Sequence, residues 1–335
     1  MATRIPTDTM RELVWPNGRA QLQRLGAMLG PVVFSRPGAP DFAPLQVAPW
    51  ADEPGAAQLP GVLRRLRGEW PCVPFGRTDR PAGLSAGWAA RQPEDDWGHG
   101  YGSNHEWQWQ ASNDPLALVL AIEPPGPLRR MTRTVRAVAH APALEITLVV
   151  ETREPCTLPI ALHPTLRLDT GPVQLLVPRH GAGITYPVSA EPGVSRLALD
   201  RSFERLEQVP CADGSSVDLT RFPLAFDTEE LLQLRDVAAP VTLRYLDADW
   251  AVRLDWDHHL LPDLMLWVSQ RGRAYAPWNG RHLALGIEPV HGAFDLGRVA
   301  VPPVDHPLAD RAGISLDPGA PLVLRYRLSA APTPG

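Results

Sequence analysis

Apolar residues recur at every second position through much of this 335-residue chain. The stretches from Leu116 to Ile122 and from Leu144 to Val150 both show this spacing. A period of two puts successive side chains on opposite faces of a strand, so both stretches are predicted to be β-strands. The same pattern predicts strands over residues 241–245, 252–256, 283–287 and 322–328, the first two joined as a hairpin.

Helical periodicity is confined to two short stretches, Leu63 to Arg67 and Phe203 to Val209. Many short strands separated by proline and glycine are typical of a sandwich or barrel. We therefore expect an all-β fold formed by residues 1–335 as a single domain. Within it, Ser35 to Pro60 is expected to be an irregular surface excursion, and Ala330 to Gly335 a frayed tail.

Lysine is absent, so the total of 32 lysines and arginines, set against 37 acidic residues, is arginine alone. Without a lysine amine, Schiff-base chemistry, a pyridoxal-phosphate anchor and a Walker phosphate loop are excluded. Because arginine keeps its proton, acid–base chemistry must come from His, Asp, Glu, Tyr or Cys. The net charge of -5 and the lack of a basic block argue against a nucleic-acid partner.

The cysteines Cys72, Cys156 and Cys211 are isolated from one another, so neither a zinc site nor a redox pair is indicated. A sparse, odd number of cysteines suits a reducing compartment. The first residues lack the apolar core of a secretory signal, and no apolar run is long enough to span a membrane. We expect a cytoplasmic protein without a membrane partner, present as a monomer or homodimer.

Four segments contain residues that could carry chemistry, and the first two combine glycine with a polar side chain. Arg77 follows an apolar run in a Pro/Gly turn, where a surface arginine at a strand end is the simpler interpretation. His99 lies among glycines and aromatic residues, which allows close approach of a ligand, although a hairpin turn would explain the pattern equally well. No helix is expected after these glycines, because Trp107 to Gln110 alternates like a strand, so this is not a phosphate loop.

The other two segments place a titratable group at the end of an apolar strand. His163 is followed by Pro164, which holds it in extended geometry, and a lone histidine of this kind is more often structural than catalytic. Glu288 follows the strand at 283–287, where a buried carboxylate is costly unless it is paired or used. Desolvation would raise its pKa toward the range of a general base, and a salt bridge to an arginine is the alternative. Residues of metal-ligand type also cluster at Asp255, Asp257, His258 and His259. Their spacing favours a solvated turn, and no metal site is predicted.

In their order along the chain, the four segments resemble the galactose mutarotase-like superfamily, which contains aldose 1-epimerases and hexose-6-phosphate 1-epimerases. Pro74 to Arg77 is similar to the family's proline-aromatic-x-arginine turn, and His99 to Tyr101 to its His-Gly-aromatic segment. Leu162 to Pro164 resembles the segment that contains the family's catalytic histidine. The segment that contains its catalytic glutamate is resembled by Gly286 to Pro289, with Phe294-Asp295 after it. The likeness extends over roughly Arg11 to Leu328.

The resemblance implies a large antiparallel β-sandwich and a reaction that needs no metal or organic cofactor. Glu288 would take the proton of the anomeric hydroxyl of a sugar while His163 protonates the ring oxygen, and the roles would reverse after rotation in the open chain. His99 would hydrogen-bond a ring or neighbouring oxygen. Hydroxyls would be held by Arg77 and Asp227, and the sugar face would be contacted by Trp267.

One departure from the family pattern bears on the substrate. Thr165 stands where the family usually has an aromatic residue after the histidine segment, which affects the shape of the pocket. Three functions stay open: an aldose 1-epimerase acting on a hexose or modified hexose, a hexose-phosphate or other anionic-sugar 1-epimerase, and a non-catalytic carbohydrate-binding sandwich. The anionic alternative requires arginines clustered at the pocket, for which Arg80, Arg129 and Arg130 are candidates.

Overall fold

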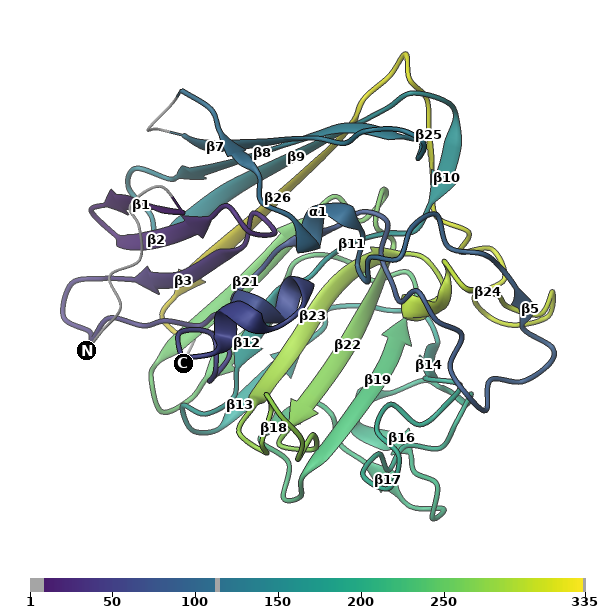
Figure 1. Cartoon of the computed structure of the whole chain (residues 1–335). Helices are drawn as coiled ribbons and strands as arrows, with labels where there is room; N and C mark the ends of the chain where they lie inside the picture. The colour runs from purple at the N-terminus through teal and green to yellow at the C-terminus, as the bar shows by residue number, and fades with distance from the viewer. Residues whose placement is uncertain (1–8, 112–114, 334–335) are drawn as a thin grey trace.

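Two large antiparallel sheets dominate the computed structural model, which describes residues 9–111 and 115–333 (Figure 1). The nine-stranded sheet has the order β18 (Arg221–Phe222), β13 (Val173–Leu176), β20 (Val241–Tyr245), β21 (Trp250–Trp256), β26 (Leu322–Ala331), β9 (Ala143–Thr152), β8 (Leu128–Ala137), β7 (Leu116–Ala121) and β6 (Gln108–Trp109). The eight-stranded sheet has the order β15 (Ser202–Phe203), β14 (Gly183–Thr185), β19 (Thr228–Leu234), β22 (Asp263–Gln270), β23 (Leu283–His291), β11 (Ile160–Leu162) and β4 (Pro71–Cys72), and β12 (Thr165–Arg167) also pairs with β23.

Smaller elements surround the two sheets. A three-stranded sheet is formed by β1 (Met10–Trp15), β2 (Gly18–Gln23) and β3 (Leu29–Phe34). Short strand pairs are formed by β10 (Cys156–Leu158) with β25 (Ile314–Leu316), β16 (Val209–Pro210) with β17 (Ser216–Val217), and β5 (Ala89–Ala90) with β24 (Ala300–Val301). The helical elements are α1 (Tyr101–Asn104) and the 3-10 turns η1 (Ala56–Gln58), η2 (Gly61–Arg65), η3 (Leu206–Gln208) and η4 (Phe294–Leu296). No helix in the described ranges has the length and apolar character needed to cross a membrane.

The period-two alternation predicted the main strands correctly. Each of the predicted strands overlaps one observed strand, namely β7, β9, β20, β21, β23 and β26. The expected hairpin is present, with Tyr245 opposite Trp250 across the turn between β20 and β21. The predicted all-β class and the large antiparallel β-sandwich are therefore confirmed.

The predictions for helices, for the irregular stretch and for the C-terminal tail need correction. The two stretches expected to be helical form only the short 3-10 turns η2 and η3, because so short a segment cannot offset the cost of helix nucleation by itself and neither turn is capped by a side chain. The stretch Ser35 to Pro60 is irregular, yet it is not a surface excursion, since Phe42 and Trp50 are buried. The tail prediction is wrong at Ala330 and Ala331, which lie in β26, and its last two residues, Pro334 and Gly335, lie outside the described residues.

The eight-stranded sheet is buried on both of its faces, and this determines where a site can form. In β22, Leu264, Leu266 and Val268 pack into the core shared with the nine-stranded sheet. The alternate residues Met265 and Trp267 face the other way, into a second core made with loops that cover the sheet. Full burial of such a side chain contributes about 1.5–3 kcal/mol, so both layers stabilise the sheet. Polar residues in strands of this sheet can therefore project into the space beneath the loops.

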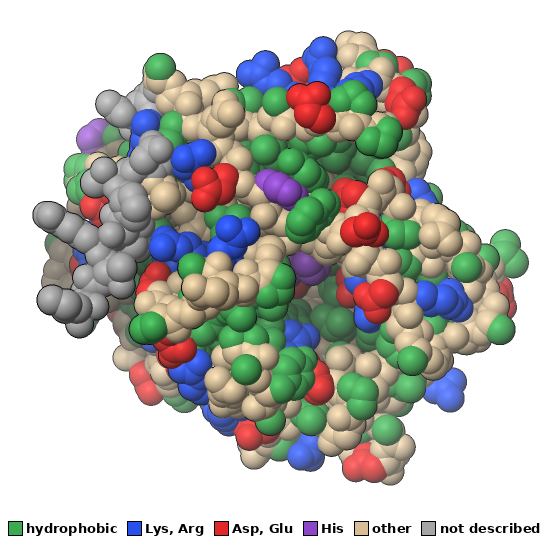
Figure 2. Space-filling view, in the orientation of Figure 1, with side chains coloured by type: hydrophobic (Ala, Val, Ile, Leu, Met, Phe, Trp, Pro, Cys, Tyr) green, Lys and Arg blue, Asp and Glu red, His purple; other side chains and the backbone are tan. Residues whose placement is uncertain are grey.

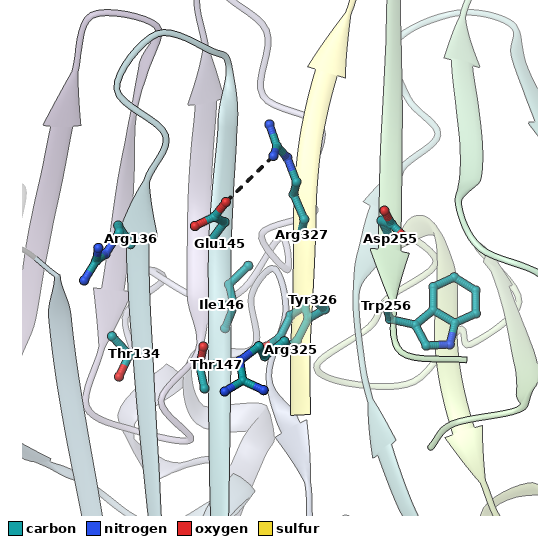
Figure 3. Close-up of a pocket in the computed structure, with 10 residues that line it drawn as sticks. All are labelled: Thr134, Arg136, Glu145, Ile146, Thr147, Asp255, Trp256, Arg325, Tyr326 and Arg327. Carbon is teal, nitrogen blue, oxygen red and sulfur yellow. Dashed lines mark ion pairs between the residues drawn. The ribbon is translucent and has the colours of Figure 1, made fainter. Parts of the chain in front are cut away.

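The nine-stranded sheet differs, because its outer face is open and carries a row of alternating charges (Figure 3). Arg136, Glu145, Arg327 and Asp255 lie opposite one another in turn across β8, β9, β26 and β21. Arg327 Nη1 is 3.8 Å from Glu145 Oε1. These residues line a shallow trough of about 630 Å³. Opposite charges on neighbouring strands stabilise a solvated sheet face, and this interpretation suffices for the trough.

Candidate active site

The strand register brings His163 and Glu288 together. Ala161 in β11 pairs with Val290 in β23, and Thr165 in β12 pairs with Gly286, so the residue midway between, His163, lies opposite Glu288. His163 Nε2 is 3.4 Å from Glu288 Oε1, and both side chains are buried. An imidazole and a carboxyl group at this separation can exchange a proton with each other or with a group placed between them.

A glycine in β23 makes room for the glutamate. A Cβ atom at position 286 would lie 2.5 Å from Glu288 Oε1 and 2.9 Å from Trp267 Cβ. Any larger residue at Gly286 would therefore push the carboxyl group away from its observed position. The glycine of the Gly286 to Pro289 segment thus leaves space for both the glutamate and Trp267.

Burial controls the protonation of the pair. Desolvation lowers the pKa of His163 well below its usual value, and the neighbouring His99 adds to the effect. Desolvation also raises the pKa of Glu288 well above its usual value, and Asp295 adds to that shift. Both shifts favour the neutral forms of the two side chains, so one transferable proton is held by the pair.

Aromatic rings hold the His163 imidazole from several sides. The ring of Trp70 stacks on it at a centroid distance of 4.0 Å and an interplanar angle of 17°. Trp267 approaches with its ring nearly perpendicular at 5.7 Å, and His99 at 5.4 Å. The backbone N–H of His163 donates to the carbonyl of Trp70 at 2.9 Å. Tight packing of this kind leaves the imidazole little freedom to rotate.

His99 is presented to the same cavity by a strained turn. Its backbone is left-handed, with φ 59°, and the N–H of His99 donates to the carbonyl of Gly76 at 2.7 Å. Gly100 also has positive φ, and a Cβ there would collide with the carbonyl of Val73. Burial, and then the nearby Arg298, lower the pKa of His99 to about 4. His99 is therefore a neutral hydrogen-bonding group at neutral pH.

A one-turn helix follows this histidine, contrary to the expectation that none would. Helix α1 (Tyr101–Asn104) is secured by two of its own side chains. Asn104 Nδ2 donates to the carbonyls of Gly98 and Gly100 at 2.7 and 2.8 Å, and Ser103 Oγ donates to that of His99 at 2.7 Å. The turn is too short to act as an anion site, and it serves to fix the loop that carries His99.

Arg77 lies one layer behind the cavity, next to Asp295. The N–H of Arg77 donates to the carbonyl of Asp295 at 2.9 Å, and the guanidinium binds Asp79 at 2.8 Å. Tyr186 Oη donates to Asp295 Oδ1 at 2.6 Å. Burial raises the pKa of Asp295, whereas Tyr186 and Arg77 oppose the shift. Asp295 lines the cavity, so Arg77 acts on the cavity through this carboxyl group.

Two tryptophans and an arginine form the other wall. Trp267 and Trp278 meet edge to face at 6.0 Å, and the guanidinium of Arg273 lies 4.6 Å from the ring centre of Trp278 and 5.5 Å from that of Trp267. Trp267 Nε1 donates to the buried Glu229 at 2.5 Å. Predicted residue Trp267 is thus in the cavity.

Asp227 does not join the cavity. It lies on the surface just before β19, where its Oδ1 accepts from Arg271 Nε at 2.8 Å. Two residues further on, Glu229 lies within the strand and is buried behind Trp267. The structure therefore places Asp227 apart from the cavity, and Glu229 is connected to it through Trp267.

The proposed arginine cluster also does not form at this cavity. Arg129 and Arg130 lie in β8 beside Glu151, and Arg80 is exposed and donates to the carbonyl of Ser85. Sequence reasoning missed Trp70, Asp295 and Arg273 as cavity residues. The Phe294-Asp295 motif contained a usable signal for one of them, while Arg273 had none.

The assembled cavity has a volume of about 170 Å³. Its polar lining residues are His99, His163, Arg273, Glu288 and Asp295, and its other walls are aromatic or aliphatic. Figure 2 shows a hollow near the middle of this face of the molecule, with a histidine inside it and acidic side chains beside it. An aromatic cavity with a few convergent polar groups is the usual form of a site for a small polar molecule.

This fold and site define a class: large two-sheet antiparallel β-sandwiches with a buried histidine–glutamate pair beneath the loops of one sheet. Solved structures identify the fold more closely. A protein from Escherichia coli K12, provisionally assigned as an aldose 1-epimerase, matches with a TM-score of 0.66 and 16% identity over 97% of this chain and 99% of its own. A GalM/aldose epimerase homologue from C. elegans matches with a TM-score of 0.61 and 12% identity over 97% and 99%. The chain has the fold of the galactose mutarotase-like superfamily.

A third solved structure agrees with this assignment. A galactose mutarotase-like protein from Lactobacillus casei matches with a TM-score of 0.59 and 13% identity over 96% of this chain and 100% of its own. No protein-family model matches the chain, and no curated protein matches its sequence. The resemblance seen in the four motifs is therefore supported by the fold rather than by overall sequence similarity.

Proposed function

We propose that the protein is an aldose 1-epimerase that interconverts the α and β anomers of a neutral hexose. The observation that carries the proposal is the 3.4 Å separation of His163 Nε2 and Glu288 Oε1 inside a largely aromatic cavity. Anomer exchange needs one proton removed from the anomeric hydroxyl and one delivered to the ring oxygen, which an acid–base pair of this kind can do.

The proposed ring opening uses this pair directly. Glu288 as a carboxylate takes the proton of the anomeric hydroxyl, whose oxygen becomes the aldehyde oxygen as the bond from the anomeric carbon to the ring oxygen breaks. The electrons of that bond stay on the ring oxygen, which takes a proton from the His163 imidazolium. Rotation about the bond next to the carbonyl and reversal of both transfers give the other anomer.

The required ionic pair differs from the neutral pair only by the position of one proton. Desolvation raises the pKa of Glu288 and lowers that of His163, which favours the neutral form of the pair. A bound sugar supplies hydroxyl groups that hydrogen-bond the ionic form and thereby reduce the desolvation of the charges. His99, neutral and rigidly held, is suited to bind a ring or neighbouring oxygen of the same sugar.

The distribution of charge supports a neutral rather than an anionic sugar. Glu288 and Asp295 both line the cavity, and an anion beside them would oppose the carboxylate form of Glu288 that the reaction requires. The arginines proposed for a phosphate group lie elsewhere on the chain. A non-catalytic sugar-binding role would leave the close approach of His163 and Glu288 without a purpose, so the enzyme is the better proposal.

Polarimetry of freshly dissolved α-anomers tests the proposal. The protein should accelerate mutarotation of at least one neutral hexose in a panel that also contains hexose phosphates and uronic acids. Glu288→Gln and His163→Ala should each lower the rate by roughly 10²–10⁴-fold. Glu145→Gln on the open sheet face is the matched control and should be silent. Acceleration that is confined to phosphates, or that survives Glu288→Gln, would refute the proposal.

A further inference from the structure

Arg273 is the one arginine among the residues that line the cavity within the described ranges. Its guanidinium lies against the faces of Trp278 and Trp267, and its side chain is 22% exposed. Cation–π contact with two rings holds a planar group in place and leaves its edges available to a ligand. Arg273 is therefore placed to donate hydrogen bonds to a molecule in the cavity.

Two glutamates that do not line the cavity form ion pairs with this arginine. Arg273 Nη2 is 3.1 Å from Glu229 Oε1, and Arg273 Nε is 3.8 Å from Glu191 Oε2. Glu229 is fully buried and also accepts from Trp267 Nε1 at 2.5 Å and Ser269 Oγ at 3.1 Å. Glu191 accepts from Tyr275 Oη at 3.2 Å. The two carboxylates are thus fixed by partners of their own as well as by the arginine.

The two glutamates offset the charge of the arginine. Arg273 carries one positive charge beside Glu191 and Glu229, neither of which lines the cavity, whereas burial favours the neutral form of Glu288 in the cavity itself. Within the described ranges, Arg273 makes no ion pair or hydrogen bond with Glu288, Asp295 or His163, although Trp267 contacts both Arg273 and His163. Arg273 therefore lies apart from the acid–base pair, and the ring of Trp267 stands between Arg273 and His163.

We propose that Glu191 and Glu229 are specificity-determining residues: they neutralise Arg273 so that it binds an uncharged hydroxyl of the sugar and does not attract a carboxylate or phosphate. This inference rests on the proposed epimerase function. Removing either glutamate charge leaves Arg273 uncompensated. The cavity would then accept a sugar that carries a negative group at the end remote from its anomeric carbon.

Binding and turnover of two matched sugars test this inference. Glucose and glucuronic acid differ at one carbon by a neutral and an anionic group. Titration calorimetry gives their affinities, and exchange NMR gives their anomerisation rates. For Glu191→Gln, the ratio of glucuronate to glucose affinity should rise roughly tenfold, since the change removes one charge next to the arginine. Glu229→Gln should raise the same ratio. Arg273→Gln combined with Glu191→Gln should abolish the gain.

The controls separate this inference from the proposed function. Glu207→Gln removes a glutamate from an exposed arginine pair of similar type, Arg205–Glu207, and should leave the affinity ratio unchanged. If the native protein anomerises a neutral hexose but neither glutamate variant moves the ratio, the inference fails and the function stands. If the native protein binds and turns over only the anionic sugar, or neither binds nor turns over any neutral hexose, both fail.

Discussion

His163 and Glu288 lie opposite each other on paired antiparallel segments, with Nε2 and Oε1 separated by 3.4 Å. They are 125 positions apart in the chain, and only the pairing of β11 and β12 with β23 brings them together. Because both side chains project into the loop-covered face of the sheet, their relative position is fixed by backbone hydrogen bonds rather than by flexible loops.

Replacing Glu288 should stabilise the protein relative to the native one, and this difference in stability should grow as the pH rises. A carboxyl group whose folded pKa is raised binds a proton more tightly when folded. The stability it contributes is therefore present below its ordinary pKa of 4.5 and lost as the pH rises above it. Glu288→Gln removes this loss, so its melting temperature relative to the native protein should increase between pH 4.5 and pH 8. A difference that stays constant over this range would contradict the pKa shift.

Gly286→Ala should lower activity with a smaller effect on folding. The new methyl group would lie 2.5 Å from Glu288 Oε1, and the carboxyl group must move. Since a displacement of about 1 Å at a reacting group can reduce the rate by roughly 10²-fold, we expect a loss of this order in kcat. Gly126→Ala is the matched control, because no atom lies within 4 Å of a Cβ there. Equal kcat for both variants would show that the glycine does not position the glutamate.

His99→Asn should raise the pKa of His163. The histidine at position 99 contributes to the lowered pKa of His163, second only to burial. Asparagine tolerates the left-handed backbone at this position better than most residues, so the loop should keep its conformation. NMR titration of the imidazole resonances of His163 measures the change. A pKa that falls or stays the same would mean that the two imidazoles are not electrostatically coupled.

Removing the buried Glu69 next to the site should strongly lower the free energy of unfolding. Arg133 forms an ion pair with Glu69, and Tyr326 Oη donates to Glu69 Oε1 at 2.8 Å. Glu69→Ala should destabilise the fold by about 3–5 kcal/mol, because it leaves the arginine buried and unpaired. Tyr326→Phe should cost about 1–3 kcal/mol, the range for leaving one buried polar group without its partner. Urea unfolding measures both, and an effect of Glu69→Ala below that of Tyr326→Phe would contradict this ranking.

The sequence predicted the strands well because the alternation of side chains between the two faces of a strand is visible in a short stretch of sequence. Leu144 to Val150 alternates so regularly that β9 could be drawn with no tertiary information. The helix α1 was missed because its stability comes from Ser103 and Asn104 bonding to the preceding glycine-rich turn, which no periodicity reports. Trp50 was misplaced for a similar reason, since its burial depends on the distant Trp278.

The site was predictable only in part. His163 and Glu288 could be selected from local motifs, but their opposition depends on register between segments 125 positions apart. Asp227 was chosen because its motif lies in the right region, but it precedes β19 and binds Arg271 at the surface, whereas Glu229 lies within the strand and binds Trp267. Arg273 follows β22 in a loop that folds back over Trp278, and this placement has no local sequence signal.

The most direct test of the central claim is magnetisation-exchange NMR on a neutral hexose at anomeric equilibrium, with the native protein, Glu288→Gln and His163→Gln. The account predicts exchange between the α and β resonances that is enhanced by the native protein and reduced at least about 10²-fold by either substitution, with sugar binding retained. Native-level exchange in Glu288→Gln, or no enhancement by the native protein for any neutral hexose that it binds, would contradict it.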